Sequence, residues 1–489
     1  MDTSNNDKLP EGQNQAGAQP IFESVPVDEA SAQKSEEAPE SMGEEYPEVP
    51  LEETAPAYEE NRMRYFFVGL GVLFFIIIFV VLIFFLRRFT GKNDKKITLV
   101  YWGLWEEAQT MSPLFEKYKR RNPAVTIEYT KMDPASYREK LIERSKNGKG
   151  PDIFRFHNTW LPMLKEIIAP LPLSIMANAT FEKTFYPVIQ KDLKIGDFYY
   201  GLPLEIDGLV LVYNDDLFKR AGLATPPKTW EDVANYATQL TVKTQEGSII
   251  TSGIALGTAT NIEHFSDIFG WMFVQNGGSL ARLTAPEARD ALEAYRKFAE
   301  SPRNVWDSDM PNSVTAFIQG KVAMIIVPSW ELSFIKLTNP DLQIKVAELP
   351  IIPGGSKVSL ANYWVEGVSK LSRNQLEGWK FLKFLVEKEN LTTFYEEASK
   401  TRLFGEPYSR VDMAPLLLQH EYIGPVIQQA PYMKSLTVVS RTFDNGANDE
   451  IIKYLEDAIS ATVNGVSYEE ALNTAQKGVE QVFQKYTIE

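Results

Sequence analysis

The sequence predicts an α/β protein that follows a single membrane-spanning helix and a disordered acidic tail. Strand and helix patterns alternate from residue 97 onward, as they do in domains built on a parallel sheet. An uncharged apolar run occupies residues 65–86, and residues 1–60 hold 16 acidic side chains. The length of 489 residues is too great for one ordinary core and suits two or three domains.

The amino-terminal tail, residues 1–64, is expected to be disordered. Residues 1–60 are rich in Glu, Pro, Ala, Ser and Gln, and their 16 acidic side chains outnumber two lysines, for a net charge of −14. Such a composition buries too little apolar surface to offset the entropy of the chain. Because the whole chain carries −15, the rest is nearly neutral at about −1, so no basic surface for nucleic acid is expected.

The apolar run at residues 65–86 is expected to cross the lipid bilayer as a permanent anchor. Its 22 uncharged residues would span about 33 Å as a helix, which matches a bilayer core. It begins too far into the chain for a signal peptide. More basic residues follow the run, in the linker at 87–96, than precede it, so the flanking charges alone favour a cytoplasmic carboxyl-terminal part.

Three strands and two helices are expected in strict alternation after the linker. The strands are residues 97–102, 125–129 and 152–156, and the helices are residues 111–121 and 137–146. This order predicts a parallel sheet, in which ligands bind beyond the carboxyl ends of the strands. Those ends fall at residues 103–107 and 157–160.

The remaining chain is also expected to alternate between strands and helices. The expected strands are residues 209–213, 253–256 and 322–327. The expected helices are residues 286–300, 314–320 and 375–388, and two more helices fill the chain from residue 449 onward, separated at Asn464-Gly465. Thr229 is expected to cap a further helix, since an acidic residue stands three positions later.

Several short motifs follow one another along the soluble part. They are Gly150-Pro-Asp-Ile-Phe154, Tyr200-Gly-Leu-Pro203, Leu211-Val-Tyr-Asn214, Pro227-Lys-Thr-Trp230, Gly320-Lys-Val-Ala-Met324 with Trp330, and Leu349-Pro350 with Pro353-Gly-Gly355. These motifs resemble those of the family 1 extracellular solute-binding proteins, the maltose-binding-protein-like components of ABC importers. Each motif is weak alone, but together they keep the family's order. The resemblance covers about residues 97–489, and the tail and the anchor depart from the family's usual secreted or lipidated form.

The resemblance implies a two-lobed periplasmic-binding-protein-like fold of type II, with a hinge that closes on ligand. Lobe 1 would comprise residues 97–207 and 360–408, and lobe 2 would comprise residues 208–359 and 409–489. The chain would cross between lobes near 206–209, 359–365 and 405–412. Since such a protein works where solute arrives, the resemblance places the carboxyl-terminal domain outside the cell membrane, against the flanking charges, with permease subunits as partners.

Sugar recognition requires aromatic platforms for C–H faces and planar polar groups for hydroxyls. The resemblance places Trp330 at a ligand-stacking position and Asp207 at an acidic position that contacts sugar hydroxyls. The other candidates follow predicted strands, lie near the crossings or occupy segments that approach the ligand in the family. They are Glu205, Asn158, Trp160, Trp105, Glu106, Tyr363, Trp364, Trp271 and Arg402. The ligand implied is a sugar or oligosaccharide.

Other functions fit the sequence less well. Glu205 and Asp207 stand two residues apart and cannot readily flank a glycosidic bond, so a glycoside hydrolase is disfavoured. The chain has no cysteine and only three scattered histidines, and we expect neither a metal nor a cofactor. A binding protein for a polyamine, peptide, phosphate ester or metal remains an alternative, as does a tethered sensor that signals through the acidic tail.

Overall fold

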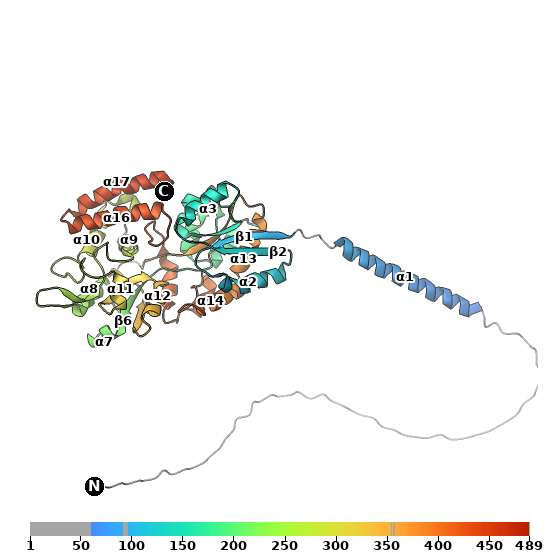
Figure 1. Ribbon diagram of the computed structural model, residues 1–489, viewed down its shortest axis with the longest axis horizontal. Coiled ribbons are helices and arrows are strands. Elements are labelled where there is room, and N and C mark those ends of the chain that lie inside the picture. The colour runs from blue at the N-terminus through green and yellow to red at the C-terminus, as the bar shows by residue number, and fades with distance from the viewer. Residues whose placement is uncertain (1–59, 91–95, 354, 356, 489) are drawn as a thin grey trace, which may run out of the picture. The chain divides into compact units, whose positions relative to one another are not determined.

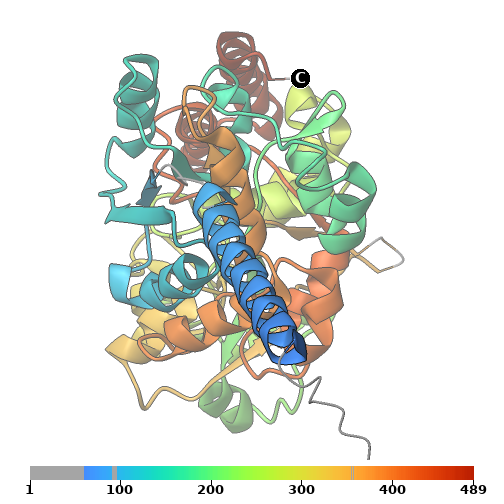
Figure 2. The same ribbon diagram turned by 90° about the vertical axis from the view of Figure 1, so that its right-hand side faces the viewer.

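The computed structural model describes residues 60–90, 96–353, 355 and 357–488, in two compact units divided at Gly91. The acidic segment at residues 1–59 and residues 91–95 of the expected linker lie outside the described residues. In the first unit, helix α1 spans Glu60–Thr90. Its Tyr65–Ile83 stretch is long and apolar enough to cross a membrane, and no other helix of the described residues meets that description. Figures 1 and 2 show α1 as one continuous helix.

The second unit contains two sheets, each with its own helices, and we call the resulting bodies lobe 1 and lobe 2 (Figure 1). The sheet of lobe 1 has the strand order β12-β3-β1-β2. Its strands are β1 (Ile97–Gly103), β2 (Val125–Lys131), β3 (Ile153–His157) and β12 (Trp364–Val368). As the alternation predicts, β1 pairs in parallel with β2 and β3, whereas β12 joins antiparallel to β3.

The sheet of lobe 2 has the strand order β10-β6-β9-β8-β7. Its strands are β6 (Leu209–Asn214), β7 (Val242–Lys243), β8 (Ile249–Ile254), β9 (Val322–Pro328) and β10 (Ile344–Ala347). Every residue of the central strand β9 is buried, because helices cover both of its faces. Short pairs outside the sheets are β4 (Lys194–Ile195) with β5 (Phe198–Tyr199) and β11 (Ser359–Leu360) with β13 (Met433–Lys434).

The helices belong to the lobes according to their contacts. Lobe 1 carries α2 (Ala108–Arg121), α3 (Tyr137–Lys146), α4 (Leu161–Leu164), α5 (Asn178–Thr184), α6 (Pro187–Asp192), α13 (Gln375–Leu385) and α14 (Lys388–Ser399). Lobe 2 carries α7 (Asp215–Arg220), α8 (Trp230–Leu240), α9 (Phe265–Gln275), α10 (Pro286–Arg296), α11 (Ser313–Ile318), α12 (Glu331–Thr338), α15 (Gly424–Gln429), α16 (Ala447–Val463) and α17 (Tyr468–Tyr486). Short 3-10 turns are Asn158–Trp160, Leu280–Arg282, Val411–Leu416 and Ala430–Tyr432.

Two neighbouring segments carry the chain between the sheets. The backbone N–H of Asn362 donates to the carbonyl of Asp207 over 2.8 Å, and Gly208 bridges to Ala361. A side chain at Gly208 would overlap the Leu360 carbonyl oxygen, so glycine permits this close approach. The first two expected crossings include these positions and stay predictions. Near the third, Ser409 and Arg410 contact Pro203 and Val386 of lobe 1; the exact lobe boundaries stay a prediction.

Candidate functional site

A cavity of about 680 Å³ takes its walls from both lobes, beside the two crossings. Lobe 1 contributes one group of residues that follows β1 and another at or just before the start of β12. Lobe 2 contributes α12 and the loop before α16. The lining residues are Trp105, Glu205, Asp207, Trp330, Ser333, Phe334, Lys336, Leu337, Asn362, Trp364, Thr401, Arg402, Leu403, Phe404, Glu406, Ser440, Arg441 and Phe443. This size is typical of small-molecule binding sites in proteins.

Aromatic rings form two groups on this lining. On the lobe 1 side, Trp105 meets Trp364 edge to face, with ring centroids 5.2 Å apart, and lies 6.0 Å from Phe443. On the lobe 2 side, Trp330 directly precedes α12 and is 39% exposed, a large fraction for tryptophan. The buried ring of His264 meets Trp330 at nearly a right angle, with ring centroids 5.6 Å apart, and so fixes the orientation of the exposed indole.

Two carboxylates lie at the crossing itself, on the floor of the cavity. Asp207 accepts hydrogen bonds from the backbone N–H groups of Gly208 (2.7 Å) and Trp330 (3.2 Å). Glu205 accepts one from the N–H of Trp364 at 3.2 Å. Burial raises the pKa of Asp207 to about 7, and burial together with the neighbouring Glu406 raises the pKa of Glu205. The floor therefore presents acceptor groups that hold their protons more tightly than ordinary carboxyls.

A buried ion cluster supports the floor from the lobe 1 sheet. Arg155 on β3 donates to Glu366 on β12 (2.6 Å) and to Glu106, and all three side chains are at most 1% exposed. Arg402, at the cavity wall, pairs with Glu406 and lies 3.6 Å from Glu106. The cluster thus connects the sheet of lobe 1 to the charged wall of the cavity.

The structure brings six of the eleven predicted site residues to the cavity: Trp105, Glu205, Asp207, Trp330, Trp364 and Arg402. The other five lie outside its lining. Glu106 belongs to the ion cluster, and Trp160 packs against Trp364 at 5.4 Å while fully buried. Asn158 and Tyr363 both donate to the half-buried carboxylate of Asp192. Trp271 is fully buried in lobe 2, where its indole N–H donates to the Val358 carbonyl.

Several lining residues were not anticipated from the sequence. Phe334 lies one helical turn after Trp330, so helical spacing offered a signal for it. Glu406 and Phe404 belong to an irregular segment without such a signal. Phe443 lies in the loop 441–446, where Arg441, Phe443 and Asn445 all have positive φ, at 59°, 55° and 43°. This conformation costs a non-glycine residue about 1–2 kcal/mol, so the surrounding contacts must hold the loop in place.

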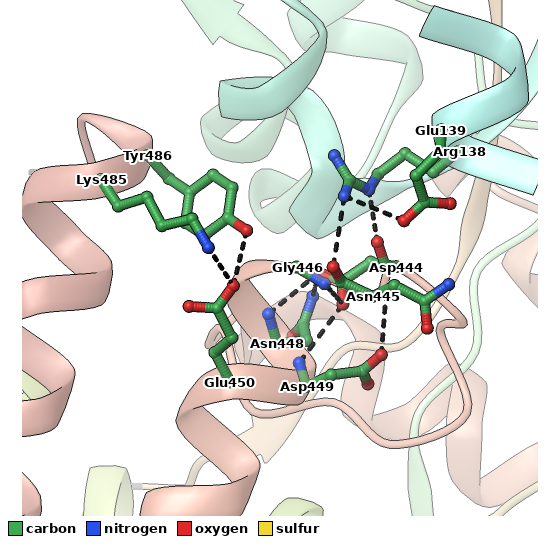
Figure 3. Close-up of polar contacts among 10 residues, drawn as sticks. All are labelled: Arg138, Glu139, Asp444, Asn445, Gly446, Asn448, Asp449, Glu450, Lys485 and Tyr486. Carbon is green, nitrogen blue, oxygen red and sulfur yellow. Dashed lines mark hydrogen bonds and ion pairs between the residues drawn. The ribbon is translucent and has the colours of Figure 1, made fainter. Parts of the chain in front are cut away.

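Contacts between the lobes hold that loop (Figure 3). Arg138 on α3 donates to the main-chain carbonyls of Asp444 and Asn445. The carboxylate of Asp444 accepts from the N–H groups of Gly446 and Asn448 at the start of α16, each at 2.9 Å. Asn448 in turn donates to the hydroxyl of Thr159 on lobe 1 at 2.6 Å. The loop that carries Phe443 into the cavity is therefore fastened to both lobes.

The chemistry of this lining is that of a binding site. Among the described residues, no group of three His, Asp or Glu side chains is arranged to hold a metal ion. His157 is fully buried and bonds Thr159 and Asn362, and burial lowers its pKa to about 3, so it serves as a neutral structural residue. The polar side chains of the lining are carboxylates, hydroxyls, one amide, one lysine and two arginines, and they stand among the aromatic rings.

Comparisons with known proteins agree with this geometry. Residues 102–391 match the family described as bacterial extracellular solute-binding protein. A putative binding protein of Brucella abortus is 25% identical over 58% of this chain and 71% of its own length. A probable ABC transporter-binding protein of Deinococcus radiodurans is 24% identical over 72% of this chain and 79% of its own. The crystal structure of a cyclo/maltodextrin-binding protein complexed with maltotetraose superposes with a TM-score of 0.65 at 20% identity, covering 81% of this chain and 98% of that one.

Proposed function

This chain belongs to the family of bacterial extracellular solute-binding proteins, and from that premise we propose that it captures a sugar or an oligosaccharide for an ABC importer. The observation that carries the proposal is the lining of the cavity between the lobes. Aromatic faces at Trp105, Trp330 and Trp364 stand around carboxylates at Glu205 and Asp207. This combination suits a ligand that has apolar C–H faces and hydroxyl groups at its rim.

Each lining residue takes a distinct part in this proposal. Trp330 stacks on a sugar ring, because its ring is 39% exposed at the cavity and its backbone N–H donates to Asp207. Asp207, Glu205 and Arg402 exchange hydrogen bonds with hydroxyls, while Trp105 and Trp364 wall the opposite side. The predicted residues outside the lining act as supports: Glu106 holds Arg155, Trp160 backs Trp364, Asn158 and Tyr363 fix Asp192, and Trp271 packs lobe 2.

Capture proceeds by closure of the lobes about the crossings at 206–209 and 359–365. A hinge needs few residues, and here the two segments are hydrogen-bonded side by side, so they bend together. The closed shape is what the permease of the importer recognises. Maltotetraose in the crystal structure cited above is a ligand of the same chemical class.

The apolar helix α1 anchors the binding domain in the cell membrane, with the carboxyl-terminal part outside. The stretch Tyr65–Ile83 supplies enough apolar length for one crossing. We place the carboxyl-terminal part outside because solute must reach the cavity from outside. This argument outweighs the basic residues that follow the helix, which alone favour the opposite orientation. The acidic tail then lies on the cytoplasmic side.

A thermal unfolding screen of the full chain in detergent tests the proposed function. A bound ligand at 100 times its Kd stabilises the native state by about 2.7 kcal/mol, so real ligands raise the unfolding temperature clearly. We expect monosaccharides or oligosaccharides to do so. Stabilisation by peptides or polyamines and by no sugar would overturn the sugar assignment.

A further inference from the structure

Among the described residues, neither carboxylate on the cavity floor forms an ion pair with a basic side chain, although Arg155 and Arg402 are near enough for their charges to act on Glu205. Glu205 and Asp207 are each 6% exposed, and the hydrogen bonds that they accept come from neutral backbone N–H groups. Buried carboxylates are ordinarily paired with a cation or bound to a metal. Their unpaired state is therefore an exception in this protein, and it occurs on the wall of the ligand cavity.

The cations nearest to this floor are all engaged elsewhere. Arg155 is shared between Glu106 and Glu366, and Arg402 pairs with Glu406. Lys336 donates to the Leu342 carbonyl at 3.1 Å, and Arg441 donates to Glu263 at 2.6 Å. Each positive charge at the cavity thus already has an acceptor of its own. No basic side chain remains for Glu205 and Asp207 unless an existing pair breaks.

Glu205 also faces a second carboxylate. Glu406 interacts with Glu205 directly, while Arg402 forms its ion pairs with Glu406 and Glu106. Two adjacent buried carboxylates repel each other unless a proton or a cation lies between them. The aromatic rings of Trp105 and Trp364 stand next to this position, and their faces attract cations as well as sugar C–H groups.

Resting on the sugar-binding function proposed above, we propose that the natural ligand carries a protonated amino group, as an amino sugar or an amino-substituted oligosaccharide does. Its ammonium group lies on the cavity floor and serves as the missing counter-ion of Glu205 and Asp207. The three N–H bonds of an ammonium group match the acceptors that these carboxylates leave free. The remaining hydroxyls and C–H faces contact Arg402 and the tryptophans.

Matched ligand pairs test this inference by equilibrium dialysis with the full chain in detergent. Each pair differs only in the replacement of a hydroxyl by an amino group: glucosamine with glucose, galactosamine with galactose, and the β-1,4-linked tetramer of glucosamine with that of glucose. We expect the amino member of at least one pair to bind about tenfold more tightly or better, as a charge-assisted bond to a buried carboxylate allows. N-acetylation of the amino group, which removes the charge, should abolish the preference.

Variants of the two floor carboxylates test whether these side chains cause the preference for amino ligands. Glu205→Gln keeps the shape and the acceptor for the Trp364 N–H, and should reduce the amino preference, which is the ratio of the two dissociation constants within a pair, about tenfold. Asp207→Asn is the second variant, and Glu128→Gln, on an exposed part of β2, is the matched control that should keep the preference. Thermal unfolding verifies that each variant is folded.

The possible outcomes distinguish failure of the amino-ligand inference from failure of the proposed sugar-binding function. Neutral sugars that bind as tightly as their amino partners overturn the inference and leave the proposed function standing. An amino preference that survives in both floor variants also overturns it. Tight binding of spermidine or putrescine with no binding of any sugar overturns the proposed function, and so does the absence of binding by every member of the pairs and by neutral oligosaccharides.

Discussion

At the scale of single residues, Trp330 connects the aromatic groups of the proposed site with its carboxylates. Its backbone N–H bonds Asp207, and its ring projects from the start of α12 with more than a third of its surface exposed. We expect Trp330→Ala to weaken binding of the sugar ligand by about 1–3 kcal/mol, because the stacked apolar face is lost. Equilibrium dialysis of the variant against the best ligand measures the change.

The stability of the protein should change little in this variant, since the ring contributes little to the core. Phe198→Ala is the matched control: Phe198 is similarly exposed, at 44%, and lies outside the cavity. The control should bind ligand as the wild type does. Unchanged affinity in Trp330→Ala would remove this residue from the site.

Asp207 should make stability depend on pH in an unusual direction. Burial raises its pKa from 3.8 to about 7, and Glu406 also acts to raise it, so between these pH values the native protein binds more protons than the unfolded chain. This group therefore lowers the free energy of unfolding as pH rises from about 4 to about 7. Relative to that of Asp207→Asn, the free energy of unfolding of the wild type should fall by up to about 1.4 kcal/mol per pH unit in that window.

Urea unfolding across that pH range measures the difference between the two proteins. Above about pH 7 the difference should become constant, because Asp207 is then ionised in both states. The exposed Asp309 provides a control variant, Asp309→Asn, which should follow wild type at every pH. A difference that grows in favour of wild type with rising pH would show that Asp207 is a conventional, stabilised carboxylate.

The candidate residues show how far sequence can locate a site. Strand ends and family motifs led to Trp105, Asp207 and Trp330, which do line the cavity. The same logic selected Trp160, yet its ring points beneath Trp364, because the 3-10 turn after β3 determines its direction. Phe443 could not be anticipated, since its position depends on a loop conformation maintained by Arg138, more than 300 residues away along the chain.

At the scale of elements, the ion cluster beneath the lobe 1 sheet makes a testable contribution to stability. Arg155→Met leaves Glu366 buried without its cation, and leaves Glu106 with only Arg402, which lies 3.6 Å away. Breaking a buried ion pair in this way costs about 3–5 kcal/mol. We expect a loss of that size in the free energy of unfolding by urea.

The control for this variant is an arginine whose ion pair is exposed. Arg289 pairs with Asp290 at 3.0 Å, and both side chains are more than half exposed. Arg289→Met should change stability by less than about 1 kcal/mol, because water screens such pairs. Equal losses in the two variants would mean that Arg155 does not neutralise the buried carboxylates.

Periodicity predicted the regular elements well where the signal was local. The parallel strands β1, β2 and β3 match their expected positions within a few residues, and Thr229 caps α8 through a capping box with Asp232. The helix expected at residues 375–388 instead ends at Leu385, and α14 follows. The carbonyl of Val386 accepts a hydrogen bond from Arg410. This partner is distant in sequence, so no local pattern could indicate it.

At the scale of the whole molecule, the membrane anchor predicts opposite locations for the two ends of the chain. The chain has no cysteine, so single introduced cysteines report location through an impermeant maleimide. Ser308→Cys, on an exposed loop of lobe 2, should label in intact cells. Ser31→Cys, in the acidic tail, should label only after the membrane is made permeable. The reverse pattern would place the binding domain in the cytoplasm and exclude import.

The apolar rim of the cavity has a calorimetric consequence. Trp330 directly precedes α12, and Phe334 and Leu337 lie on that helix with 54% and 82% of their surface exposed. Removing apolar surface from water lowers the heat capacity of the system. A ligand that extends across this rim therefore binds with an enthalpy that becomes more negative on warming, while one confined to the polar floor does so much less. The temperature slope of the binding enthalpy thus measures how far a ligand reaches along the cleft, even between ligands of equal affinity.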